Sequence, residues 1–197
     1  GSAGRAETDE SGRHPIYPAR AGCHLTPVLI HTLTLLTALA GVPPRVDLPA
    51  ARALIARVLP ASAARFDVAA LPDRAGHNVF EVESRGPRVV LRGSSGVAIA
   101  SALNWYLEQV AGVNASLPLK PIALPTPLPA VPAKVHRTTP YRIRYFFNYC
   151  TFSYSMAWWD WPEWQAMIDW MALKGINAPL AVTGQEGVWR LMLQDAG

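Results

Sequence analysis

Two polar side chains and two tryptophans lie close together in the sequence near residue 150 and could bind a small ligand. Asn148 ends the strand-like segment 141–148 and Cys150 follows it, and Trp158 and Trp159 come shortly before a helix-like segment. An amide donates and accepts hydrogen bonds, and an indole ring offers an apolar face for stacking. Plain packing is the alternative for the tryptophans. Cys150 fits a small wall residue better than a nucleophile, because no histidine is near it in sequence to activate a thiolate.

The segments around these residues predict one βαβ unit. Segment 141–148 is a strand by residue type, 160–174 is a helix, and 176–182 is a second, buried strand. Asp160 and Glu163 form a capping pair at the start of the helix. The spacing places one stripe of the helix against its neighbours: Trp161, Trp164, Ile168 and Met171.

The βαβ order predicts where polar residues meet. Two parallel strands joined by a helix have their C-terminal ends on the same side, and ligands bind at that edge of parallel α/β folds. Asn148 and Cys150 after the first strand should therefore face the same crevice as Gln185 and Glu186 after the second. Pro179 is an irregularity, because proline cannot donate to a central ladder.

An earlier region, residues 48–119, predicts a small α/β domain. Its segments are a helix at 51–59, short strands at 66–70, 78–82 and 88–91, and a helix at about 96–110. Gly93-Ser94-Ser95-Gly96 opens the second helix and is interpreted as a tight turn with a serine N-cap. A phosphate loop is the alternative, but the Walker lysine is missing.

Residues 120–140 are dense in proline, which blocks helix and central strand and favours extended chain. We expect an interdomain linker packed along a surface. A ligand for an SH3-type domain is the alternative; the apolar residues between the prolines argue against it.

Residues 1–47 predict a leader rather than a domain. Segment 25–40 is apolar and too short to span a bilayer comfortably, and it ends Ala38-Leu39-Ala40, a small-x-small pattern that signal peptidase prefers. We expect a signal peptide, with a buried helix or a translated leader as alternatives. Asn114-Ala115-Ser116 is an N-glycosylation sequon and agrees with a secretory route.

Composition argues against several classes of function. Hydrophobic residues make up 50% and charged residues 16% of the chain, as in globular proteins. The net charge of +4 comes from scattered basic residues, which gives no support for nucleic-acid binding. Two cysteines, Cys23 and Cys150, and five dispersed histidines do not make a metal site. We therefore expect no metal, no cofactor, and no membrane segment in the mature protein.

Several motifs in residues 140–195 resemble glycoside hydrolase family 89, the alpha-N-acetylglucosaminidases. The motifs are RYFFNYCT at 144–151, SYS at 153–155, WWDW at 158–161, IDWMAL at 168–173, GIN at 175–177 and TGQE at 183–186. The resemblance implies a small N-terminal α/β domain followed by the first βα units of a (β/α)8 TIM barrel, truncated so that 141–197 is only its start. A weaker similarity, RGSSGVA at 92–98, extends it to the first domain.

The resemblance also implies an activity. Family members are retaining exo-glycosidases that remove terminal α-linked N-acetylglucosamine from heparan sulfate or related glycans, and those of animals are lysosomal. It places Asn148 and Cys150 at the sugar pocket, Gln185 and Glu186 in the GQE motif, and both catalytic glutamates beyond Gly197. This chain alone is then expected to be inactive. The protein is expected in the secretory pathway, with a lysosomal, vacuolar or extracellular destination. A carbohydrate-binding or interaction module without catalysis is the alternative.

Overall fold

The computed structural model describes residues 46–181 and 184–196. The predicted signal segment 25–40 lies outside the described residues, as do Val182 and Thr183. No helix in the described ranges is both long and apolar enough to cross a bilayer.

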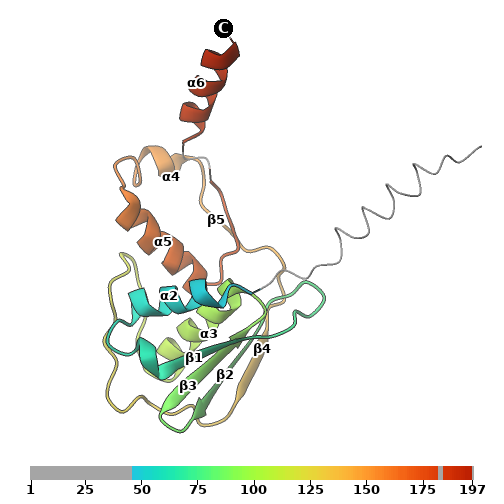
Figure 1. The fold of residues 1–197 in the computed structure, drawn as a ribbon, viewed down its shortest axis with the longest axis vertical. Coiled ribbons are helices and arrows are strands. Elements are labelled where there is room, and N and C mark those ends of the chain that lie inside the picture. Colours follow the sequence, from blue (N-terminus) through green and yellow to red (C-terminus); the bar gives the residue numbers. More distant parts are fainter. Residues whose placement is uncertain (1–45, 182–183, 197) are drawn as a thin grey trace, which may run out of the picture. The chain divides into compact units, whose positions relative to one another are not determined.

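A four-stranded mixed sheet forms the first region, with two helices over one face (Figure 1). The strand order is β1-β3-β2-β4, in which β1 and β3 are parallel and the other two pairs are antiparallel. The elements in chain order are α2 (Leu48–Val58), the short 3-10 helix η1 (Ala63–Arg65), β1 (Phe66–Ala70), β2 (Val79–Arg85), β3 (Arg88–Gly93), α3 (Gly96–Gln109) and β4 (Val135–Thr138). The predicted helices and strands of this domain are thus present, with ends shifted by a few residues.

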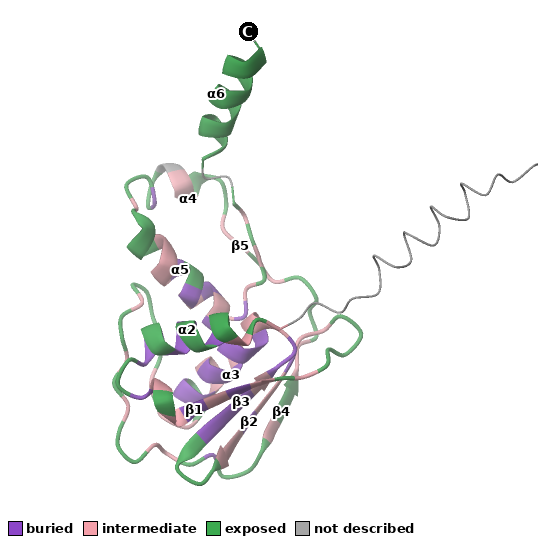
Figure 2. Ribbon diagram, in the orientation of Figure 1, coloured by how far each residue is buried: buried purple, intermediate pink, exposed green. Residues whose placement is uncertain are grey.

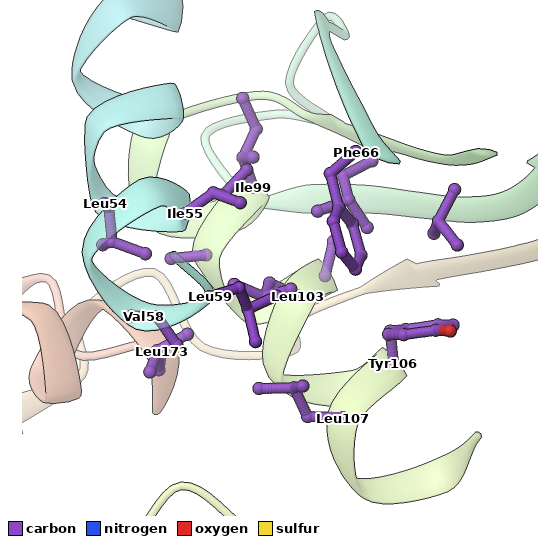
Figure 3. Close-up of a cluster of buried hydrophobic side chains, with 14 of the residues drawn as sticks. Leu54, Ile55, Val58, Leu59, Phe66, Ile99, Leu103, Tyr106, Leu107 and Leu173 are labelled. Carbon is purple, nitrogen blue, oxygen red and sulfur yellow. The ribbon is translucent and has the colours of Figure 1, made fainter. Parts of the chain in front are cut away.

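The core lies between the sheet and the two helices, because alternate strand residues and one face of each helix are apolar. Val82 of β2 and Leu91 of β3 face Leu103 and Tyr106 of α3, and all four are fully buried. Phe66 meets the Tyr106 ring edge-on at 5.5 Å between centroids. Figure 2 shows the buried residues gathered in α3 and the strands, and Figure 3 shows the side chains converging from α2, β1 and α3.

The turn before α3 confirms the capping interpretation of the GSSG motif. The Ser95 hydroxyl accepts a hydrogen bond from the Ala98 N–H at 3.0 Å, and the Ser94 hydroxyl accepts from Val79 N–H at 2.9 Å. Gly93 is required by close packing, since a Cβ there would lie 2.6 Å from the backbone nitrogen of Ile99. The two serines therefore serve backbone groups rather than a phosphate.

The proline-rich segment 120–140 corrects the linker interpretation, because it belongs to the first domain. Ile122 N–H donates to Val58 O at 2.8 Å, Val131 N–H to the Ser84 hydroxyl at 2.9 Å, and the Tyr106 hydroxyl to Pro129 O at 2.8 Å. The last part is strand β4, which pairs with β2 and contains no proline. Without prolines, those four residues can complete a ladder.

The second region confirms the βαβ order, although its strands are much shorter than predicted. It consists of β5 (Tyr145–Phe146), α4 (Cys150–Ser153), α5 (Trp161–Leu173), β6 (Ala178–Pro179) and α6 (Gln185–Ala196). Strands β5 and β6 are parallel. Ala178 and Leu180 donate to the carbonyls of Arg144 and Phe146 at 3.3 and 3.0 Å. Pro179 is tolerated because its missing N–H falls between these two donors, on the edge that faces away from β5.

The burial of α5 differs from the predicted stripe. Trp161 and Ile168 are exposed, whereas Met167, Asp169, Met171 and Leu173 are buried. The reason is that α5 contacts two neighbours rather than one: Met167 and Met171 pack in an aromatic cluster near β5, and Leu173 enters the core of the first domain (Figure 3). A single-stripe prediction cannot represent a helix with two buried faces.

Candidate functional site

A largely apolar groove of about 920 Å³ lies beside the end of β5 and the first turns of α5. We call it the β5–α5 groove. It is lined by residues 117–120 and 146–148 and by Thr151, Ser155, Met156, Trp159, Pro162, Glu163, Ala166 and Met167. Its polar groups are therefore an amide, two hydroxyls, a lysine and a carboxylate set in an apolar wall, the usual composition of a small-ligand site.

Asn148 lies in the wall of this groove, at the end of the first barrel strand. Its Oδ1 atom accepts from Thr151 N–H and from the Thr151 hydroxyl, both at 3.2 Å, which holds the side chain over the first turn of α4. The preceding residue, Phe147, has a φ of 76°, in the left-handed region that is costly for a large side chain. With Oδ1 engaged locally, the free donor of the amide is Nδ2.

An aromatic cluster separates the two predicted stacking residues. The Trp159 ring meets Trp164 edge-on at 5.3 Å between centroids, and Trp164 stacks on Phe152 at 5.9 Å. Trp159 is half-buried and lines the β5–α5 groove. Trp158 is 94% exposed and is outside the lining. Only Trp159 thus presents its ring to the groove.

The remaining predicted site residues lie elsewhere on the described surface. Cys150 is exposed at the first position of α4, and its side chain is outside the lining of the groove. Gln185 and Glu186 open α6 and are exposed. Thr183 of the same motif falls outside the described residues. The structure therefore places Asn148 and Trp159 in the lining of the β5–α5 groove. The other four predicted residues are outside this lining: Cys150, Trp158, Gln185 and Glu186.

Sequence reasoning missed the contribution of the first domain to the groove. Residues 117–120 form part of its wall, and Lys120 brings a cation to it. Glu163, interpreted from the sequence only as a cap, also lines it while accepting from the Asp160 N–H at 3.1 Å. Nothing in the spacing of residues 117–120 signals this role, because it arises from tertiary packing against α5.

Five carboxylates lie between residues 160 and 195, and three of them contact other groups of the protein. Asp160 and Glu163 cap α5. Asp169 is 4% exposed and receives two hydrogen bonds from the Arg57 guanidinium, at 2.6 and 2.7 Å. That contact raises the pKa of Arg57, mainly through the hydrogen bond to Asp169. Glu186 and Asp195 are exposed on α6. A retaining glycosidase needs two carboxyl groups about 5–5.5 Å apart at the sugar, and of these five carboxylates only Glu163 lines the β5–α5 groove.

Arg144 and Asn177 fix the spacing of the two barrel strands. The Arg144 guanidinium donates to the carbonyls of Gly175 and of Tyr141, and burial lowers its pKa. The Asn177 amide bridges the Arg144 N–H and the Arg142 carbonyl, at 2.8 Å each. These contacts fix the N-terminal ends of β5 and β6 relative to one another. Among the described residues, no three His, Cys, Asp or Glu side chains cluster as a metal site would require.

Comparison with known families and proteins identifies the chain's relatives. Residues 49–130 match the N-terminal domain of alpha-N-acetylglucosaminidase, and residues 144–197 match its TIM-barrel domain. The human alpha-N-acetylglucosaminidase is 47% identical over 146 residues, which are 72% of this chain. The chain belongs to the alpha-N-acetylglucosaminidase family. Both regions described above are therefore family domains, and the βαβ unit is the beginning of a TIM barrel.

Solved structures of the family agree with this assignment. The family 89 glycoside hydrolase from Clostridium perfringens, in complex with 2-acetamido-1,2-dideoxynojirmycin, matches with a TM-score of 0.71 and 31% identity over 90% of this chain. A form with two glutamates replaced by glutamine, in complex with its substrate GlcNAc-alpha-1,4-galactose, matches with a TM-score of 0.70 and 30% identity over 92%. The chain spans about a fifth of the length of these relatives.

Proposed function

We propose that the protein carrying this chain is a retaining exo-glycosidase that removes terminal α-linked N-acetylglucosamine from glycans. The observation that supports this most directly is the 47% identity to human alpha-N-acetylglucosaminidase over 146 residues. The relative from C. perfringens was solved with a substrate of this class, GlcNAc-alpha-1,4-galactose. We propose heparan sulfate as a second substrate. The proposed location is the secretory pathway, with a lysosomal, vacuolar or extracellular destination.

In this proposal the chain supplies binding groups rather than the catalytic pair. Asn148 donates from Nδ2 to a sugar hydroxyl while Thr151 holds its Oδ1 atom. Trp159 offers an apolar ring in the wall of the β5–α5 groove. The two catalytic glutamates come from later barrel strands. Cys150, Trp158, Gln185 and Glu186 contribute only if completion of the barrel brings them to the same edge.

Kinetics of Asn148→Ala in the full-length protein test the proposed role. We expect kcat/KM toward an aryl α-N-acetylglucosaminide to fall roughly tenfold or more, because one hydrogen bond worth about 1.5 kcal/mol is lost. The melting temperature should stay within a few degrees, because Asn148 is exposed. The matched control is Tyr149→Ala, a neighbouring exposed residue outside the groove lining, which should retain normal kinetics. Unchanged kinetics combined with a large loss of stability would show a structural role for Asn148 instead.

A second measurement separates catalysis from simple binding. Calorimetric titration with GlcNAc-alpha-1,4-galactose, run beside an assay for released N-acetylglucosamine, distinguishes the two. Release supports the hydrolase. Binding without release by the full-length protein supports the alternative, a carbohydrate-binding or interaction module that has lost catalysis.

A further inference from the structure

The sequon Asn114-Ala115-Ser116 lies in the coil that follows α3, where the two domains meet. Asn114 and Ser116 are exposed, and Ala115 between them is 1% exposed. Ala115 and the residue after Ser116, Leu117, are not proline. This sequon is the single N-x-S/T triplet in the 197-residue sequence. The segment thus offers its first and third side chains to solvent while the middle one anchors it.

Contacts from α5 and the residue after it fix this segment. The Trp170 indole N–H donates to the Ala115 carbonyl at 3.1 Å. The Lys174 ammonium donates to Asn114 Oδ1 at 3.3 Å and to Glu108 Oε1 at 2.7 Å. An ammonium group has donors only, so the oxygen of the Asn114 amide must be the atom that faces it. The amide nitrogen, Nδ2, therefore lies on the side away from Lys174, on an exposed residue.

We propose that Asn114 carries an N-linked glycan at the junction of the two domains. The donor is a lipid diphosphate-linked oligosaccharide in the secretory pathway. A bond forms between Asn114 Nδ2 and the anomeric carbon of the first sugar while the bond from that carbon to the diphosphate oxygen breaks. One Nδ2 proton passes to a base of the transferase, and the lipid diphosphate leaves. No oxidation or reduction takes place.

The product is compatible with the folded contacts. N-glycosylation leaves the amide oxygen in place, so Lys174 can keep its hydrogen bond to Oδ1 in the modified protein. The glycan then extends from Nδ2 into solvent, next to the Lys174–Glu108 ion pair and outside the β5–α5 groove, whose lining begins at Leu117. The modification therefore marks the domain junction.

Mass spectrometry of glycopeptides tests the proposal. The full-length protein is expressed in eukaryotic cells behind a heterologous signal sequence, so the test does not depend on segment 25–40. Retained and secreted material are both analysed, because the glycan is added before folding is complete. We expect the Asn114 peptide to carry a glycan that peptide-N-glycosidase removes, leaving aspartate at that position.

Two substitutions of one residue provide the matched pair. Ser116→Ala removes the hydroxyl that the sequon needs and should abolish the glycan, whereas Ser116→Thr keeps a hydroxyl and should retain it. Asn114→Asp abolishes the glycan while preserving an acceptor for Lys174, so it separates loss of sugar from loss of the contact. Recovery of unmodified Asn114 from wild-type material, or a glycan on that peptide in Ser116→Ala, overturns the proposal.

Discussion

The first domain encloses its own core, whereas the barrel start leaves many large apolar side chains in water. In the first domain Val82, Leu91, Leu103 and Tyr106 have no exposed surface. In the barrel start Tyr145 of β5 is 61% exposed, and α6 exposes Val188, Trp189, Leu191, Met192 and Leu193. The difference comes from strand pairing. Four strands with two covering helices make a layer complete, whereas two strands of a barrel have open edges and lack the neighbours that would cover them.

One end of α5 is the exception and joins the two regions. Leu173 is buried among the core residues of the first domain (Figure 3). Asp169 pairs with Arg57 of α2. Lys174 reaches Glu108 of α3. The first domain therefore supplies, for one helix of the barrel, the burial that later barrel elements would otherwise have to supply.

The largest effect expected at this junction is that of Leu173→Ala. Leu173 is 1% exposed, and removing its side chain leaves a cavity that costs about 2–5 kcal/mol of unfolding free energy. Urea denaturation of the purified chain, followed by tryptophan fluorescence, measures it. The matched control is Ile168→Ala on the exposed side of the same helix, where the loss should stay below about 1 kcal/mol. Equal losses at the two positions would mean that α5 is not docked on the first domain.

A smaller effect is expected when the ion pair of the junction is broken. Asp169→Ala removes two hydrogen bonds to Arg57, whose side chain is 39% exposed, so solvent limits the loss to about 1–3 kcal/mol. A double-mutant cycle with Arg57→Ala isolates the interaction. Additive losses in the cycle would show that the two side chains do not interact in solution.

Acid should weaken the junction at a defined pH. The hydrogen bond from Lys174 lowers the pKa of Glu108 below its ordinary value of 4.5. A carboxylate with a lowered folded-state pKa stabilises the fold fully above its unfolded-state pKa and loses that contribution as pH falls through the folded-state pKa. We expect stability to decline below about pH 4.5. Glu108→Gln and Lys174→Met should both flatten this part of the profile, by up to about 1 kcal/mol; flattening by only one of them would argue against the pair.

The smallest effect on stability is expected from substitution of the two adjacent tryptophans, and the loss of unfolding free energy should differ between them. Trp158→Ala should change the unfolding free energy by less than about 0.5 kcal/mol, because Trp158 is 94% exposed. Trp159→Ala should cost more, since it removes the edge-on contact with Trp164. Thermal unfolding by circular dichroism gives both values. A larger loss at Trp158 would reverse the assignment of Trp159 to the groove wall.

Local patterns predicted the first domain well because its elements carry their own signals. The period of α2, the Ser95 cap and the alternation in β1 and β2 are all properties of neighbouring residues. The parallel order of β5 and β6 followed from strand–helix–strand succession. What could not be predicted was long-range. The pairing of β4 with β2, the burial of Leu173 and the groove wall at Lys120 join residues far apart in sequence.

For the candidate site, the sequence predicted six binding residues, and the structure places two of them, Asn148 and Trp159, in the lining of the β5–α5 groove. Asn148 follows the first strand, and strand ends are reliable positions for ligand groups. Trp158 and Trp159 are indistinguishable by sequence position, and only the turn of the chain before α5 separates them. The positions of Gln185 and Glu186 relative to the sugar depend on elements that the two-stranded start does not contain.

The burial of Leu173 in the first domain has a consequence for synthesis on the ribosome. Residues 46–140 leave the exit tunnel before α5 does, so the first domain can form its sheet and much of the apolar cluster that Leu173 joins while the barrel is still being translated. Helix α5 then meets a folded surface instead of waiting for the rest of its own barrel. The early domain acts as a template that nucleates the later one, and the order of the two domains along the gene becomes part of the folding route.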